Sequence, residues 1–174
     1  MADNRLKLSA RDRDDLAVIA ACVQDALAPI GEMAYLTAEH RFVVALNRFR
    51  WEQLDAGALV RADADRLPRR QRGDAAFLEA GDGRPPYERI HSGLRFESVT
   101  AVRTKNIDLR NRERILALLT IQAEPASVTL VFADDAVIRL EVTDLRCFLE
   151  DFSDPWPTRW RPCHPDDVAG SKQQ

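Results

Sequence analysis

The feature that most constrains this fold is a run of alternating apolar residues between Val128 and Val142. Alternation with a period of two is typical of strands that bury one face. Asp134 and Asp135 divide the run, and Asp favours turns because its side chain bonds to its own backbone. The run therefore predicts a β-hairpin whose inward positions include Leu140.

The residues after this hairpin change to a helical period. Thr143 or Asp144 is a suitable N-cap. The apolar residues that follow recur at i, i+3, i+4 and i+7, and they are Leu145, Phe148, Leu149 and Phe152. The pattern predicts a C-terminal helix in which Phe148 and Phe152 are buried with Leu140 and Val142.

A second helix is expected near the N-terminus. Ser9 and Asp12 resemble a capping box, with Asp in place of the usual Glu. Helical spacing then relates Leu16, Ile19, Ala20, Val23 and Leu27. Pro29 and Gly31 are residues that commonly end a helix, so we expect the helix to stop there.

Four further segments have the composition and alternation of strands: 33–37, 42–51, 89–107 and 115–123. In the second segment the apolar residues change face near Asn47, and in the third they change face near Ser98. These changes of face indicate a bulge or a strong twist near Asn47 and a bend or a bulge near Ser98. In the last segment, Ile115, Leu119 and Ile121 are expected to share one face.

The order of elements predicts an α+β fold. We expect one strongly curved antiparallel sheet, or a half-open barrel, with flanking N- and C-terminal helices. This plan resembles the pleckstrin-homology superfold, in which a strand meander ends in a capping helix. A single domain is expected over residues 1–165, with a long loop or insertion over 53–87 and a disordered tail over 166–174.

Composition excludes several classes of protein. The net charge of −3 gives no general attraction to nucleic acid. No uncharged apolar run approaches the roughly 20 residues of a membrane span, and the first residues do not resemble a secretory signal. Cys22, Cys147 and Cys163 are odd in number and show no paired spacing, which fits reduced thiols. We expect a cytoplasmic protein that does not enter a membrane.

Three segments resemble a known family. They are GLRFESVTAVRTKNID (93–108), VTLVFADDAVIRLEVTDLRCFLEDF (128–152) and DPWPTRWRPCHP (154–165). The chain is similar in these segments to small uncharacterised proteins of alphaproteobacteria, which are classed as a domain of unknown function. Members typically have Gly in the hairpin turn, where this chain has Asp134, Asp135 and Ala136. The resemblance implies no reaction.

No catalytic, metal or cofactor motif is present. Gly81-Asp82-Gly83 is followed by Arg84-Pro85-Pro86 rather than by a helix, so it fits neither phosphate-loop pattern. The three His residues lack the spacing of a zinc site. His91, near Glu88, Arg89 and Glu97, is the best candidate for acid–base chemistry, although polar residues on strands are more often simply solvated.

Two segments are candidate binding sites. The first is an Arg-rich stretch, whose proposed contacts to phosphate or RNA are Arg66, Arg69, Arg70 and Arg72. It holds no aromatic residue that would stack on bases, and only 3 of the 25 basic residues in the chain are Lys, so a solvated loop in an Arg-biased protein is the alternative.

The second candidate is the Trp- and Pro-rich tail, with Trp156, Arg159 and Trp160 as proposed partner contacts. Its alternative is that the Trp residues fold back over the domain itself. The leading hypothesis is therefore a non-enzymatic binding or adaptor domain that acts through contacts with a protein partner or a second copy. An RNA- or phosphate-binding module is the alternative, and a small enzyme that uses His91 comes third.

Overall fold

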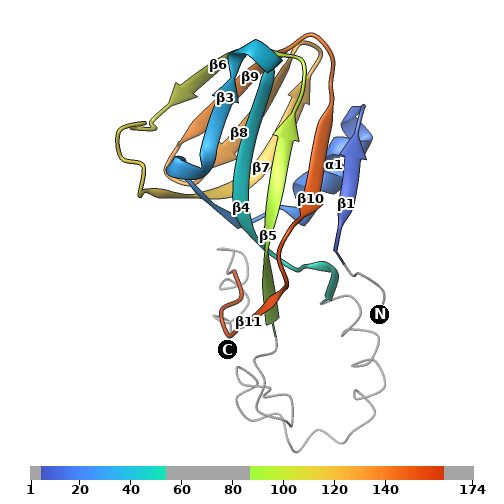
Figure 1. Ribbon diagram of the computed structural model, residues 1–174, viewed down its shortest axis with the longest axis vertical. Coiled ribbons are helices and arrows are strands. Elements are labelled where there is room, and N and C mark those ends of the chain that lie inside the picture. Colours follow the sequence, from blue (N-terminus) through green and yellow to red (C-terminus); the bar gives the residue numbers. More distant parts are fainter. Residues whose placement is uncertain (1–4, 54–86, 163–174) are drawn as a thin grey trace, which may run out of the picture.

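The computed structural model describes residues 5–53 and 87–162. Within them the chain forms eleven strands and a single α-helix (Figure 1). The strands are β1 (Lys7–Ala10), β2 (Ala26–Pro29), β3 (Met33–Leu36), β4 (Arg41–Phe49), β5 (Tyr87–Phe96), β6 (Val99–Lys105), β7 (Ile115–Glu124), β8 (Ser127–Phe132), β9 (Val137–Val142), β10 (Cys147–Asp151) and β11 (Trp156–Thr158). The helical segments are α1 (Arg13–Cys22) and the short 3₁₀ turns η1 (Ile30–Glu32) and η2 (Thr37–Glu39).

All strands belong to one antiparallel sheet. Its order is β1-β10-β5-β4-β2-β7-β8-β9-β6, while β3 pairs with β4 and β11 pairs with β5. Most neighbours in the second half are joined by short links, which favours antiparallel pairing. Figure 1 shows the barrel formed by these strands above β11, with α1 and β1 on one side.

The sheet closes into a barrel because β5 continues into β6 through the corner Glu97–Ser98. Ser98 has a left-handed backbone, with φ of 60°. The Glu97 N–H donates to Arg146 O at 3.0 Å, and the Thr143 N–H donates to Ser98 O at 3.0 Å. These bonds carry the β5–β10 ladder around the corner into the β6–β9 ladder. With β5 and β6 counted as one bent strand, six strands close the barrel, and the bend expected near Ser98 is confirmed.

Closure of the barrel corrects the predicted fold class. The protein is mostly β, not α+β, and the described residues contain no C-terminal helix. Residues 147–151 instead form β10, which buries Cys147, Leu149 and Asp151 and turns Phe148 and Phe152 outward. The resemblance to the pleckstrin-homology superfold depended on a C-terminal capping helix, so the absence of that helix from the described residues makes this comparison wrong. Leu149 would be buried in either a helix or a strand, so its burial does not distinguish the two. The segment is a strand because β10 pairs with β1 on one side and with β5 on the other.

The N-terminal helix is confirmed, but its ends differ from those expected. Asp12 is the N-cap, and its carboxylate accepts a hydrogen bond from the Asp15 N–H at 2.8 Å, whereas Ser9 lies in β1. The helix ends at Cys22 because the chain turns at Asp25, which has φ of 59°, into β2. Among the described residues, no helix is both long and apolar enough to cross a membrane.

Two expected strand patterns also need correction. In β7, Leu116 and Leu118 are buried, while Ile115 is 56% exposed and Leu119 is 42% exposed. A register shift against β8 between Leu118 and Thr120 then returns Ile121 to the core. No bulge occurs near Asn47 in the pairing of β4 with β5, which is continuous, so of the two alternatives expected there only a strong twist stays a prediction.

Most domain boundaries stay predictions. Apart from Gln53 and Tyr87, the expected insertion over 53–87 lies outside the described residues, and so does the expected tail over 166–174.

The hairpin turn between β8 and β9 yields a stability prediction. Asp134 and Asp135 have φ of 60° and 55°, a conformation that Gly adopts without steric cost. Asp135→Gly should therefore raise the free energy of unfolding, by up to about 1 kcal/mol, in chemical denaturation. Asp135→Ala is the control at the same position and should lower it. A Gly variant no more stable than the Ala variant would contradict this account of the turn.

Candidate functional site

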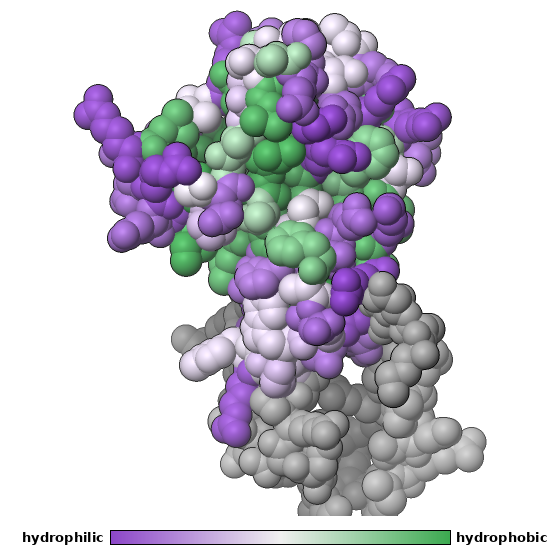
Figure 2. All heavy atoms as spheres, viewed as in Figure 1, coloured by the Kyte–Doolittle hydropathy of each residue, from purple (hydrophilic) through white to green (hydrophobic). Residues whose placement is uncertain are grey.

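The outer face of β4, β5 and β10 carries apolar side chains around two hollows. Core-facing side chains alternate with outward ones, so this face receives every second residue of each strand. At its centre Ala45 of β4 lies opposite Gly93 of β5, and Gly93 lies opposite Glu150 of β10. Figure 2 shows hydrophobic atoms along the middle of this face, with hydrophilic groups on both flanks.

Small residues at the centre leave two adjoining hollows, which together we call the groove. The first hollow has a volume of about 400 Å³, and its lining includes Leu27, Ile115 and His91. The second has a volume of about 350 Å³, and its lining includes Val43, Gly93 and Phe148. Both hollows are lined by Glu32, Ala45 and Phe152. Because these three residues are shared, the two hollows lie next to each other.

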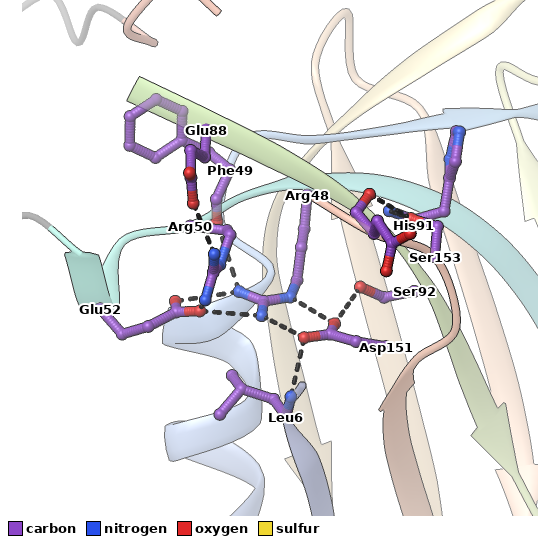
Figure 3. A network of polar contacts seen from close by, with 11 residues as sticks. Leu6, Arg48, Phe49, Arg50, Glu52, Glu88, His91, Ser92, Asp151 and Ser153 are labelled. Atoms are coloured by element: carbon purple, nitrogen blue, oxygen red, sulfur yellow. Dashed lines mark hydrogen bonds and ion pairs between the residues drawn. The ribbon is translucent and has the colours of Figure 1, made fainter. Parts of the chain in front are cut away.

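Aromatic rings border the groove at the β11 end. The His91 ring lies 4.5 Å from the Trp156 ring and 6.0 Å from the Phe152 ring, measured between centroids. Two hydrogen bonds to the His91 backbone hold this arrangement. The Phe152 N–H donates to His91 O at 3.0 Å. The backbone N–H of His91 donates to Ser153 Oγ at 3.0 Å (Figure 3). The structure thus joins His91 and Trp156, which sequence reasoning had assigned to separate sites.

The acid–base cluster proposed around His91 is not assembled. Glu88 forms an ion pair with Arg50, and Glu97 forms ion pairs with Arg41 and Arg95. Arg89 donates to the carbonyl oxygen of Asn47 at 3.2 Å. The His91 ring therefore has aromatic neighbours rather than these carboxylates, and the described residues contain no group of side chains suited to a metal ion.

Neither described cysteine has the features of a nucleophile. Burial raises the pKa of the Cys147 thiol far above its usual value. Burial also raises the pKa of Cys22, although the charge of Arg48 opposes part of that change. A raised thiol pKa leaves little reactive thiolate at neutral pH. Cys163 lies outside the described residues, as do Gly81-Asp82-Gly83 and the four arginines proposed to bind phosphate or RNA.

The two Trp residues of the tail lie in different environments. Trp156 is half-buried, because β11 pairs with the first residues of β5 and places Trp156 opposite Arg89. Trp160 is 81% exposed, and Arg159 is also exposed. The fold-back interpretation thus fits Trp156, whereas Trp160 remains a candidate partner contact together with Arg159.

A buried polar network lies on the inner face of the same three strands (Figure 3). The Arg48 guanidinium donates to both carboxylate oxygens of Asp151, at 2.9 and 2.7 Å. The side chains of Arg48 and Asp151 have no exposed area. Arg48 also donates to both oxygens of Glu52, at 3.0 and 2.9 Å. Ser92 Oγ and the Leu6 N–H complete the hydrogen bonds to Asp151.

This network favours the charged form of its acids. Burial alone would raise the pKa of Asp151, but hydrogen bonds from Arg48, Ser92 and the Leu6 N–H outweigh burial and lower it. The pKa of Glu52 is lowered in the same way, mainly by Arg48. The oxygens of Asp151 already accept four hydrogen bonds, which leaves little capacity for a substrate. We therefore assign the network to stability rather than to catalysis.

Sequence reasoning missed both Arg48 and the groove residues Glu32 and Phe152. Arg48 occupies the next inward position of β4 after Leu46. A charged residue at a position that alternation assigns to the core was the sequence signal that could have revealed the buried network. Its partner Asp151 was hidden by the prediction of a helix over that segment. The same error placed Phe152 in the core, although it is 55% exposed.

The family model described as "Protein of unknown function (DUF2948)" matches residues 6–164. The chain belongs to this family. The resemblance to a domain of unknown function is confirmed, while an alphaproteobacterial origin stays a prediction. The DUF2948 match includes the groove, the polar network and both tail Trp residues. No curated protein and no solved structure matches the chain.

The buried ion pair yields a prediction that depends on pH. The pKa of Asp151 is lower in the folded state, so the pair stabilises the protein above about pH 4 and is lost as acid protonates the carboxylate. At pH 7, Asp151→Ala should lower the free energy of unfolding by about 3–5 kcal/mol, since it leaves Arg48 charged and buried. In urea denaturation the difference from wild type should shrink as the pH falls below 4.

The control replaces both partners, because an apolar pair leaves no unpaired charge. The double variant Arg48→Met/Asp151→Leu should recover most of the stability that Asp151→Ala loses. Equal destabilisation by the single and double variants would refute the pairing account.

The tail yields a second prediction, for which the chain provides a matched pair of Trp residues. Trp156→Ala should lower the melting temperature, because it removes a half-buried indole that packs on His91, with a cost of about 1–2 kcal/mol. Trp160→Ala should leave the melting temperature unchanged, because that indole is 81% exposed. Thermal melts followed by circular dichroism measure both effects, and equal shifts would contradict the structural difference between the two residues.

Proposed function

We propose that this protein is a non-enzymatic binding domain that holds a segment of a partner protein in the groove. The observation that carries the proposal is the cluster of exposed apolar side chains around two adjoining hollows. Phe152 is 55% exposed and Ile115 is 56% exposed, and both line the first hollow. Aromatic and aliphatic side chains around a hollow are typical of protein-binding sites, because a partner removes their surface from water.

The position of the groove on paired strands supports this proposal. β4 pairs with β5 from Phe42 to Phe49, and β5 also pairs with β10. A paired strand holds its side chains in fixed directions, so little ordering is needed when a partner binds. The tail extends this surface, since Trp156 borders the groove and the exposed Trp160 and Arg159 follow it in the chain.

The other hypotheses have less support. The RNA- or phosphate-binding hypothesis depends on arginines that lie outside the described residues. The enzyme hypothesis depends on His91, whose proposed acidic neighbours pair with arginines instead. We also propose that the protein is cytoplasmic, because its three cysteines are odd in number and show no paired spacing.

Photo-cross-linking at two matched positions tests the proposal. Phe152 in the groove is 55% exposed, and Val18 on α1 is 57% exposed. A photoreactive phenylalanine analogue at position 152 should form a discrete protein adduct in cells that naturally make the protein, whereas the same analogue at position 18 should not. RNA adducts at position 152, or identical protein adducts at both positions, would refute a specific protein-binding groove.

A further inference from the structure

We propose that the first hollow binds a lysine or arginine side chain of the partner segment. This inference rests on the proposed function and specifies the chemistry of the partner. A basic side chain combines an apolar stem with a charged end, so its binding site needs an apolar wall and an acid at the rim. The first hollow contains both.

Glu32 provides the acid. It ends the short turn η1 and is the only charged side chain among the described residues that line the first hollow. Glu32 is exposed, and within residues 5–53 and 87–162 it forms no ion pair. The basic residue Arg112 approaches the same turn, but its guanidinium donates to the carbonyl oxygen of Gly31 at 2.8 Å. The carboxylate of Glu32 is thus available to a cation from outside.

The wall of the hollow fits the rest of such a side chain. Leu27, Pro29 and Ile115 provide aliphatic surface for the stem. Phe152 also lines the hollow, and the face of a phenylalanine ring attracts a cation. A volume of about 400 Å³ is ample for one long side chain.

The second hollow fits the residues next to that side chain. Apart from the shared Glu32, its charged lining residues already have partners: Arg95 pairs with Glu97 at 3.1 Å and lies over the Phe148 ring at 4.6 Å, and Glu150 pairs with Lys7 at 3.1 Å. Gly93 leaves the sheet surface open at its centre, because an added Cβ would meet only Glu150 O, at 4.0 Å. We infer a partner segment with a basic residue in the first hollow and an apolar residue in the second.

Small-molecule probes test the basic residue separately from partner binding. We would titrate the full-length, ¹⁵N-labelled protein with n-butylguanidinium, n-butylammonium and the neutral analogue n-butylurea. Either cation should shift the amide signals of Glu32, Ala45, Asn47 and Phe152 in a saturable way. Butylurea should bind at least about tenfold more weakly, because it lacks the charge that Glu32 attracts.

Two variants with a matched change of charge complete the test. Glu32→Gln should remove the preference for the cations, whereas Glu150→Gln, whose side chain lines the second hollow only, should keep it. Both residues are exposed, and the amide spectra will report whether each variant is folded. Equal binding of butylurea and the cations, absence of shifts at these amides, or an unchanged preference in Glu32→Gln would each overturn the proposal. The cross-linking experiment at position 152 tests protein binding separately from these titrations. A failed titration would therefore refute the basic contact without refuting a protein-binding groove.

Discussion

The interaction on which the rest of the structure depends is the buried ion pair between Arg48 of β4 and Asp151 of β10. The two residues are 103 positions apart in the chain, and β5 lies between their strands. A charge without exposed area is tolerated only when hydrogen bonds replace those it made to water. Here each partner provides those bonds for the other, and Ser92 of β5 adds one more. The pair therefore fixes the relative positions of three strands at one end of the core.

The same three strands present the groove on their opposite face. Alternation sends Asp151 inward and Phe152 outward, and it sends Ser92 inward and His91 outward. An error of one residue in the register would exchange these faces, exposing the ion pair and burying the groove residues. Such an exchange would separate Arg48 from its buried site and would bury outward charges such as Arg95 and Glu150. The inner network therefore also protects the arrangement of the outer surface. Stability on one face and proposed binding on the other thus follow from one register.

The C-terminal segment shows where sequence periodicity became ambiguous. Leu145, Phe148, Leu149 and Phe152 fit a helix, while Cys147, Leu149 and Asp151 fit a strand with an acid at an inward position. A carboxylate on a buried face argues against a strand unless a cation lies opposite. Arg48 is that cation, but nothing local to the segment indicates it. The helix prediction failed for this reason, and Phe152 was consequently placed in the core instead of the groove.

The sequence by itself determined the features that depend on near neighbours. These include the helix near the N-terminus, the hairpin with two Asp residues at its turn, the bend at Ser98 and most strand positions, because turn chemistry and alternation act over a short span of residues. Only the tertiary structure decided the closure of the barrel, the identity of β10 and the meeting of His91, Phe152 and Trp156. These features depend on pairing between strands that are far apart in the chain. The free energy of such pairing comes from contacts with cross-strand neighbours, which cannot be identified from a short stretch of sequence.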